Sequence, residues 1–134
     1  MEDREVAELI EAARAARGKA YVPYSNFAVG AAVRTVTGEV YTGCNIENGS
    51  YGLTNCAERT AIFKAVSEGH RRFTHLAVIC DTRDVCTPCG ACRQVISEFG
   101  EGMTIYLTNL QGKLRVVRVD DLLPGAFNLT ENRR

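Results

Sequence analysis

Three cysteines and one glutamate in this 134-residue chain have the types and spacing of a catalytic metal site. Cys89 and Cys92 are three residues apart at the start of a helical pattern, and Cys56 opens another helical pattern and can meet them. Three thiolates bind zinc and leave its fourth tetrahedral position open for water, which is typical of catalytic sites. Glu58 follows Cys56 by two residues, so it can face the metal without binding it and move a proton from the bound water.

Arg59 lies three residues after Cys56, on the same helical face. Three thiolates over-cancel the charge of Zn²⁺ and make a bound water less acidic. A guanidinium that donates to the thiolates withdraws part of that charge, and we expect this role for Arg59. The alternative interpretation is a surface arginine with an acidic neighbour.

The remaining cysteines have simpler interpretations. The cysteines at 86–92 form a C-x2-C-x2-C run that could hold an iron–sulfur cluster, but that pattern needs a fourth thiolate soon after, and position 96 is Ile. Cys86 precedes the predicted helix, so we expect a loop cysteine that does not bind the metal. Cys44 and Cys80 lie in strand-like runs and are predicted core residues.

Composition limits the class of protein. The 16 Lys and Arg balance the 16 Asp and Glu, which argues against nucleic acid as the main partner. No apolar run is long enough to span a bilayer, and the charged N-terminus lacks the apolar core of a signal peptide, so we expect a cytoplasmic protein without a membrane partner. Clustered cysteines in such a chain bind metal more often than they form disulfides.

The order of predicted elements indicates the fold. Helices are predicted over residues 3–17, 56–68, 89–99 and 121–123, and strands over residues 27–36, 39–45, 73–81, 103–108 and 114–119. We expect Asp120 to cap the last helix. This order predicts an α/β fold, a three-layer α/β/α sandwich with a mixed five-stranded sheet, and places the metal between the two cysteine-bearing helices. We expect one domain over 1–134, with mobile tails at 1–5 and 128–134.

Several residues outside the metal motif could bind a substrate. Asn45 and Glu47 face the same way in an extended chain, and an amide beside a carboxylate suits a sugar hydroxyl, although the same letters are also typical of a polar turn. Phe27 could pack against a flat ring or belong to the core. Tyr51 lies in the turn-rich segment 48–53, where a simple connection would have little use for a tyrosine.

These segments together resemble the small, homotetrameric, zinc-dependent cytidine deaminases. Cys56-Ala57-Glu58 with Pro88-Cys89-Gly90-Ala91-Cys92 is similar to the zinc nucleobase deaminase signature, in the form where cysteine replaces the first histidine. Further segments resemble the family in its own order, namely residues 23–27, 29–32, 43–48 and 122–124, and the resemblance covers about residues 6–127.

The resemblance implies hydrolysis of cytidine and 2′-deoxycytidine to uridine and 2′-deoxyuridine with release of ammonia, as in pyrimidine salvage. It implies one zinc per subunit, held by Cys56, Cys89 and Cys92, with Glu58 as the catalytic residue and Arg59 beside the thiolates. The substrate-binding residues that it implies are Phe27, Asn45, Glu47, Gly49, Tyr51, Ala57 and Phe127.

Within that set, the resemblance assigns Phe27 to the pyrimidine ring and Asn45 with Glu47 to the ribose 3′-hydroxyl. It also implies a homotetramer in which Tyr51 and Phe127 project into a neighbouring subunit's site. The alternative for both aromatic residues is packing within their own subunit.

Three rival functions remain open from the sequence. A structural zinc or iron–sulfur module would use the same cysteines and leave Glu58 idle. A deaminase of a nucleoside antibiotic such as blasticidin S shares the zinc motifs, but residues 45–48 favour ribose. A polynucleotide-editing deaminase is disfavoured by the neutral charge, the short chain and the lack of a basic or aromatic track.

Overall fold

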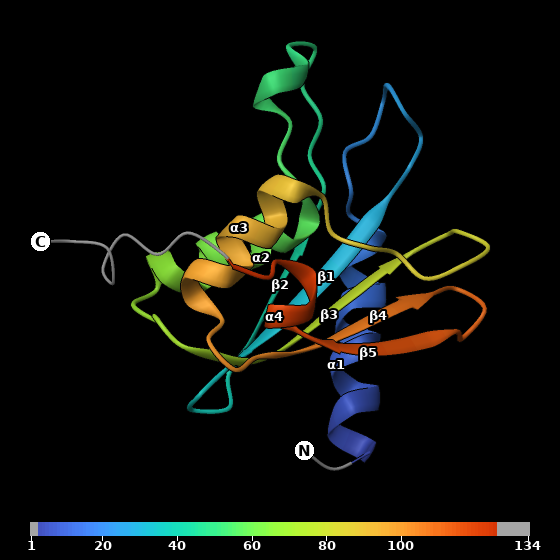
Figure 1. The fold of residues 1–134 in the computed structure, drawn as a ribbon. Coiled ribbons are helices and arrows are strands. Elements are labelled where there is room, and N and C mark those ends of the chain that lie inside the picture. Colours follow the sequence, from blue (N-terminus) through green and yellow to red (C-terminus); the bar gives the residue numbers. More distant parts are fainter. Residues whose placement is uncertain (1–2, 126–134) are drawn as a thin grey trace, which may run out of the picture.

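The computed structural model describes residues 3–125 and leaves residues 1–2 and 126–134 undescribed (Figure 1). Its helices are α1 (Asp3–Arg17), α2 (Ala57–Ser67), α3 (Gly90–Phe99) and α4 (Val119–Leu122), with a short 3₁₀-helix at Tyr51–Leu53. Its strands are β1 (Val29–Thr35), β2 (Val40–Cys44), β3 (Phe73–Cys80), β4 (Thr104–Asn109) and β5 (Leu114–Arg118). Residues 3–5, which fall within both the predicted helix 3–17 and the predicted tail 1–5, form the first turn of α1, and the other predicted tail, 128–134, lies outside the described residues.

The five strands form one mixed sheet in the order β2-β1-β3-β4-β5. The β3–β4 pair is parallel, and the other neighbouring pairs are antiparallel. A parallel pair needs a crossover connection, and α3 provides it between β3 and β4. The predicted α/β fold with a mixed five-stranded sheet is therefore confirmed.

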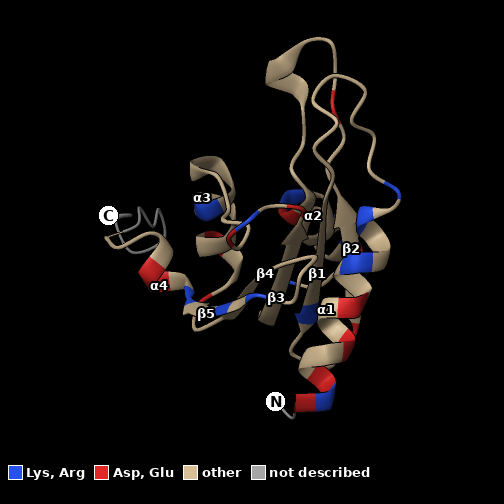
Figure 2. Cartoon of the chain, turned by 90° about the vertical axis from the view of Figure 1, so that its right-hand side faces the viewer, with Lys and Arg blue, Asp and Glu red and all other residues tan. Residues whose placement is uncertain are grey.

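Helices cover both faces of the sheet, with α1 on one side and α2 and α3 on the other (Figure 2). Leu9 and Ala13 of α1 are buried in one core cluster with Ala32 and Ile79 of the sheet. A Cβ added to Gly30 would lie 2.0 Å from the carbonyl oxygen of Ala13, so the glycine allows α1 to approach β1 closely. None of the helices within residues 3–125 has the length and apolar character needed to cross a membrane.

The approach of α2 to the opposite face also depends on a glycine. A Cβ added to Gly43 of β2 would lie 2.5 Å from the backbone nitrogen of Ala61 and 2.7 Å from the carbonyl oxygen of Ala57. The missing side chain lets the first half of α2 lie directly on the sheet. Because Cys56 and Glu58 stand at the start of that helix, this contact fixes their position relative to the strands.

The predicted cap of the last helix is wrong. α4 begins two residues earlier than we predicted, so Asp120 lies within it. Asp121 serves the cap instead, because its carboxylate accepts a hydrogen bond from the backbone nitrogen of Arg118 at 3.0 Å. A run of two aspartates offers two registers for a capping box, and the structure adopts the second.

Candidate active site

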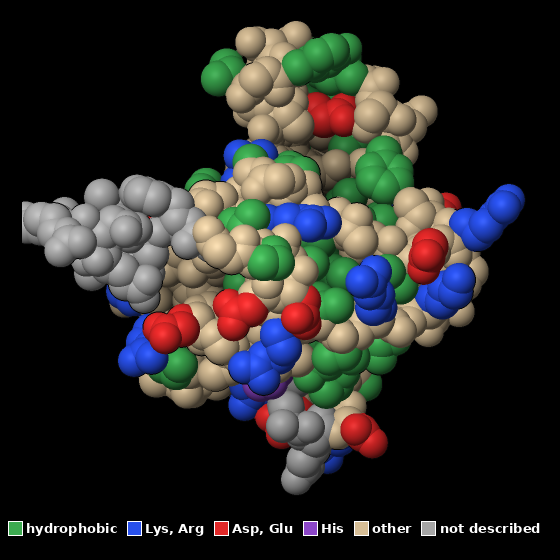
Figure 3. Space-filling model, viewed as in Figure 1, with side chains coloured by type: hydrophobic (Ala, Val, Ile, Leu, Met, Phe, Trp, Pro, Cys, Tyr) green, Lys and Arg blue, Asp and Glu red, His purple; other side chains and the backbone are tan. Residues whose placement is uncertain are grey.

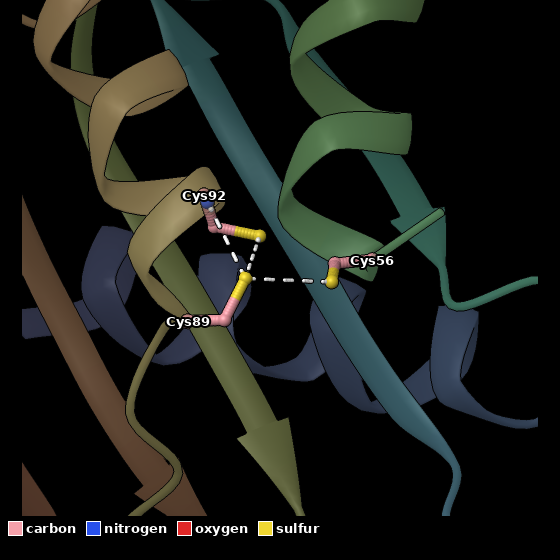
Figure 4. Close-up of side chains that lie close together, drawn as sticks. All are labelled: Cys56, Cys89 and Cys92. Atoms are coloured by element: carbon pink, nitrogen blue, oxygen red, sulfur yellow. Dashed lines mark hydrogen bonds between the residues drawn. The ribbon is translucent and has the colours of Figure 1, made fainter. Parts of the chain in front are cut away.

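Three cysteine thiols converge between the N-termini of α2 and α3 (Figure 4). The Sγ atom of Cys89 lies 3.8 Å from that of Cys56 and 3.2 Å from that of Cys92, and all three sulfurs lie within 4.8 Å of one another. Cys92 is buried, Cys56 is partly buried and Cys89 is exposed. Within residues 3–125 this is the group of side chains placed to hold a metal, and Cys86 is not part of it.

Two of the three cysteines are helix caps. Cys56 and Cys89 have extended backbones immediately before α2 and α3, and the Cys89 sulfur accepts a hydrogen bond from the backbone nitrogen of Cys92 at 3.4 Å. The first N–H groups of a helix have no partner within the helix and carry partial positive charge. The two helix ends therefore provide a favourable environment for anionic sulfur ligands.

The guanidinium of Arg59 contacts this thiol cluster. Its Nη2 donates a hydrogen bond to the sulfur of Cys56 at 3.3 Å. Hydrogen bonds from Cys92 and Arg59 lower the pKa of Cys56 to about 5, although burial opposes them. The same contact with Cys56 raises the pKa of Arg59 above its ordinary value. These contacts give Arg59 the geometry that the predicted charge-withdrawing role requires.

Glu58 is buried next to the cluster, with 4% of its surface exposed. Burial raises the pKa of Glu58 to about 7, and the negative charge of Cys56 acts in the same direction. Hydrogen bonding from Cys92 acts in the opposite direction, because it favours the ionised carboxylate. A carboxyl group with a pKa near neutrality can both accept and donate a proton, as a general acid–base residue must.

The arrangement fits a zinc ion. Sulfur ligands about 2.3 Å from a tetrahedral zinc lie about 3.8 Å from one another, and the sulfur separations here range around that value, from 3.2 Å to less than 4.8 Å. In the described part of the chain, the Nε of Arg59 is a buried nitrogen without a hydrogen-bond partner. Such a donor beside thiols suits a site whose sulfurs become fully ionised when they bind a metal.

Asn45 and Glu47, predicted to bind a sugar hydroxyl, hold the segment that precedes β1. The carboxylate of Glu47 accepts hydrogen bonds from the backbone nitrogens of Tyr24 at 3.0 Å and Ser25 at 3.2 Å, and from the hydroxyl of Ser25. These bonds, with that of the Ser25 hydroxyl foremost, lower the pKa of Glu47. The Nδ2 of Asn45 donates to the carbonyl oxygen of Phe27 at 2.7 Å.

Two segments extend together beyond the end of the sheet, residues 18–28 between α1 and β1 and residues 45–56 between β2 and α2, and we call them the projecting part (Figure 1). They contain two of the predicted aromatic contacts, Phe27 and Tyr51. Phe27 is 41% exposed and Tyr51 is 75% exposed, so neither belongs to the core of its own chain. The ring of Tyr51 meets that of Tyr24 edge to face at a centroid distance of 6.2 Å. Figure 3 shows several hydrophobic side chains on the projecting part, set among polar groups and an acidic side chain.

The other predicted substrate-binding residues have different settings. A Cβ added to Gly49 would lie 3.2 Å from the hydroxyl oxygen of Tyr24, whereas Ala57 is fully buried at the start of α2. Phe127 lies outside the described residues. A pocket of about 320 Å³ opens on the projecting part, and its lining residues are Tyr24, Ser25, Glu47, Tyr51 and Thr54.

Two residues whose hydrogen bonds hold loops in place were not predicted. Ser25 binds Glu47 through both its backbone and its hydroxyl, and the side chain of Asn109 makes hydrogen bonds to two loops. A serine in a proline-containing loop and an asparagine before a turn are ordinary in sequence. The one signal for Asn109 was its place directly after a strongly apolar strand, where a polar side chain is brought close to the core.

Comparison with known proteins agrees with the geometry. A family model described as the cytidine and deoxycytidylate deaminase zinc-binding region matches residues 3–108. Cytidine deaminase of Sporosarcina psychrophila is 58% identical over 125 residues, which cover 92% of each chain, and that of Halalkalibacterium halodurans is 58% identical over 120 residues, which cover 89% of this chain and 91% of the relative. A crystal structure of cytidine deaminase from Burkholderia pseudomallei is 54% identical, with a TM-score of 0.88 over 95% of this chain and 100% of that chain.

The matched region contains all three thiols of the cluster, the buried carboxyl beside them and the projecting segment. The resemblance predicted from the sequence, and with it the deaminase class of enzyme, is confirmed. The chain belongs to the cytidine and deoxycytidylate deaminase family.

Proposed function

We propose that the protein catalyses zinc-dependent hydrolysis of cytidine and 2′-deoxycytidine to uridine and 2′-deoxyuridine with release of ammonia, and that it serves pyrimidine salvage in the cytoplasm. The observation that carries this proposal is a buried carboxyl group, Glu58, with a pKa of about 7 beside a cluster of three thiols. The relatives named cytidine deaminase support the choice of nucleoside.

Cys56, Cys89 and Cys92 are the residues that would hold one zinc per subunit. When bound, zinc supplies a water that ionises near neutral pH and a positive charge at the reacting centre. Arg59 withdraws electron density from the thiolates through its hydrogen bond to Cys56, which keeps that water acidic despite three anionic ligands.

Glu58 is the general acid–base residue of the proposed reaction. It accepts the proton of the water whose oxygen adds to C4 of cytosine, and it delivers that proton to N3. It then takes the remaining proton from the hydroxyl group added at C4 and passes it to the 4-amino group, so that the C4 carbonyl forms, the C4–N bond breaks and ammonia leaves. Burial suits Glu58 to this work, because a pKa near 7 lets both protonation states occur during one turnover.

Asn45 and Glu47 are proposed to recognise the 3′-hydroxyl of the sugar, which both nucleosides carry. The Nδ2 of Asn45 has a second hydrogen besides the one given to Phe27, and the Glu47 carboxylate retains lone pairs beyond its three bonds. Their existing bonds hold both side chains in place before a substrate arrives, which reduces the cost of binding.

The aromatic part of the substrate site is proposed to come from more than one chain. We assign Phe27 and Ala57 to the pyrimidine side of the site, and Gly49, Tyr51 and Phe127 to contacts across a homotetramer interface. Tyr51 supports this assignment, because a side chain that is 75% exposed on a projecting segment is available to a second copy of the chain.

Ultraviolet absorbance with cytidine, 2′-deoxycytidine and free cytosine, together with metal analysis, tests the proposal. We expect turnover of both nucleosides, loss of activity with a zinc chelator, and roughly 10⁴-fold poorer use of cytosine, which leaves the sugar-binding groups unpaired. Glu58→Gln is expected to retain zinc and lose activity by on the order of 10²–10⁴ or more. Zinc binding without ammonia release would instead indicate a structural metal module, and a Glu58→Gln variant with a tenth of wild-type activity would exclude the proton-transfer role.

A further inference from the structure

The side chain of Asn109, the last residue of β4, is 1% exposed and joins two loops. Its Oδ1 accepts hydrogen bonds from the backbone nitrogens of Gln111 at 3.1 Å and Lys113 at 2.9 Å, in the turn between β4 and β5. Its Nδ2 faces the consecutive carbonyl oxygens of residues 82–84, at 3.0, 3.2 and 3.3 Å. Donors on one side and acceptors on the other fix the orientation of the amide.

The second of these loops leads directly to the thiol cluster. Residues 81–89 connect the end of β3 to α3 and end at Cys89, the cap of that helix. Cys86 lies within the connection, and its backbone nitrogen is bonded to the carbonyl oxygen of Thr108 at 3.4 Å. The connection is therefore tied to two successive residues of β4, by a backbone bond at Thr108 and by the side-chain amide at Asn109.

The position of this connection matters because the thiols come from separate elements. Cys56 is fixed by α2, which rests on β2, whereas Cys89 and Cys92 are placed by the connection and by α3. The Cys89 and Cys56 sulfurs are 3.8 Å apart, and a shift of the connection would change that separation directly. The amide nitrogen also gives the partly buried connection a side-chain donor, and removal of that donor would leave its contacts with the carbonyl oxygens of residues 82–84 unmade.

We propose that Asn109 is a positioning residue for the metal site. Its amide holds the connection against β4, so that Cys89 and Cys92 remain at the distance from Cys56 that a shared metal requires. The inference rests on the zinc site of the proposed function. It concerns retention of the metal rather than proton transfer, because Asn109 bonds to backbone atoms of the two loops and not to the thiols.

Two substitutions separate the halves of the amide. Asn109→Asp keeps the size and the oxygen that accepts from Gln111 and Lys113, but it turns a second acceptor toward the carbonyls of 82–84. Asn109→Ala removes both sets of bonds. Leu9→Ala is the control, because Leu9 is buried in α1 on the other face of the sheet and its truncation costs stability without touching either loop.

The measured quantities are the rate of zinc release to a chromophoric chelator and the thiolate-to-cobalt absorption of cobalt-loaded proteins. We expect Asn109→Asp and Asn109→Ala to release zinc on the order of tenfold faster than wild type, with a shifted cobalt band. Leu9→Ala should release zinc at the wild-type rate when each protein is measured equally far below its melting temperature.

A rate of zinc release within twofold of wild type in both Asn109 variants would overturn the inference. Release from Leu9→Ala as fast as from the Asn109 variants would also overturn it, because it would show that any loss of stability speeds zinc release. If Asn109→Asp does not fold, Asn109→Ser retains a single donor and gives the same comparison. A wild-type protein that binds no zinc would refute the proposed function itself, whereas a zinc-loaded wild type with unchanged Asn109 variants would refute only this positioning role.

Discussion

Glu58 and Cys56 stand two residues apart at the start of one helix, yet their pKa values shift in opposite directions. The pKa of Cys56 falls to about 5 because Cys92 and Arg59 donate hydrogen bonds to its sulfur, and the pKa of Glu58 rises to about 7 because the carboxyl is buried. The two shifts separate the roles of the residues. A thiol that ionises readily suits a metal ligand, and a carboxyl that retains its proton suits acid–base chemistry.

The shift at Glu58 predicts how the stability of the metal-free protein depends on pH. Its pKa is higher in the folded chain, about 7, than the ordinary 4.5, so the folded state binds the proton more tightly. The contribution of Glu58 is most favourable below pH 4.5, and it is lost as the pH rises toward 7. Relative to Glu58→Gln, the metal-free wild type should lose on the order of 3 kcal/mol of unfolding free energy between pH 5 and pH 8.

Urea unfolding of both metal-free proteins under reducing conditions measures this difference. The variant is the control for the titrating groups that do not interact with Glu58, whereas the neighbouring thiols feel its charge and titrate as part of the measured difference. Parallel stability profiles for wild type and Glu58→Gln across the pH range would show that the buried carboxyl titrates at its ordinary pKa.

At the scale of elements, the site depends on how closely α2 lies on the sheet. Gly43→Ala would place a Cβ against backbone atoms of Ala57 and Ala61. Backbone atoms within a helix cannot move aside as the end of a flexible side chain can. We expect α2 to shift from β2, with a loss of about 1–3 kcal/mol in unfolding free energy and weaker zinc binding, because Cys56 moves with the helix.

Gly52→Ala is the matched control for this prediction, since a Cβ there would meet nothing within 4 Å. Chemical unfolding and a zinc-chelator competition on both variants give the comparison. A Gly43→Ala protein with the unfolding midpoint and zinc affinity of Gly52→Ala would mean that the close contact has no role in holding the site.

Hydrophobic periodicity, together with glycine and proline residues at the ends of segments, predicted the main helices and strands well. It did so because the apolar residues of each element lie on the face that packs against the core. Boundaries were less accurate where polar residues decide them. β1 begins at Val29 rather than Phe27, since the backbone of Phe27 is bonded outside the sheet: its nitrogen donates to the Ser25 hydroxyl oxygen, and its carbonyl oxygen accepts from the Asn45 side chain. The 3₁₀-helix at Tyr51–Leu53 was not predicted, because three residues are too few for a periodic pattern.

Only the part of the candidate site that depends on local sequence spacing was predicted. The spacing of the cysteines is local and indicates a metal motif directly, and the structure brings the three thiols together. The contacts of Asn109 with residues 82–84 join positions about 25 residues apart, so only the folded chain reveals them. The outward placement of Phe27 and Tyr51 likewise depends on the tertiary arrangement of the projecting part.

At the scale of the whole molecule, the projecting part leaves apolar surface that a single chain does not cover. Leu53 is 71% exposed and Tyr51 is 75% exposed on the segment that leads into α2. Apolar side chains that project together from a small protein are typical of a surface that contacts another protein. This exposure supports the proposed assembly, in which neighbouring chains complete each site.

A mixing experiment tests whether sites are shared. Glu58→Gln and Tyr51→Ala should each be inactive as pure assemblies. After joint dissociation and reassembly, some sites would combine an intact Glu58 from one chain with an intact Tyr51 from another, so activity should return. Each variant carried alone through the same cycle is the control, and native mass spectrometry verifies mixed assemblies. Verified mixed assemblies without activity would place Tyr51 outside a shared site.

The thiols of Cys56 and Cys89 are separated by 33 positions along the chain, with the whole of β3 between them. Their meeting point exists only when the chain is folded, so an ion held there favours the native state by mass action. Each tenfold rise in free zinc above the dissociation constant then adds about 1.4 kcal/mol of stability. The melting temperature of the protein would consequently rise with the concentration of free zinc. In a cell that lacks zinc, the protein would unfold at a lower temperature.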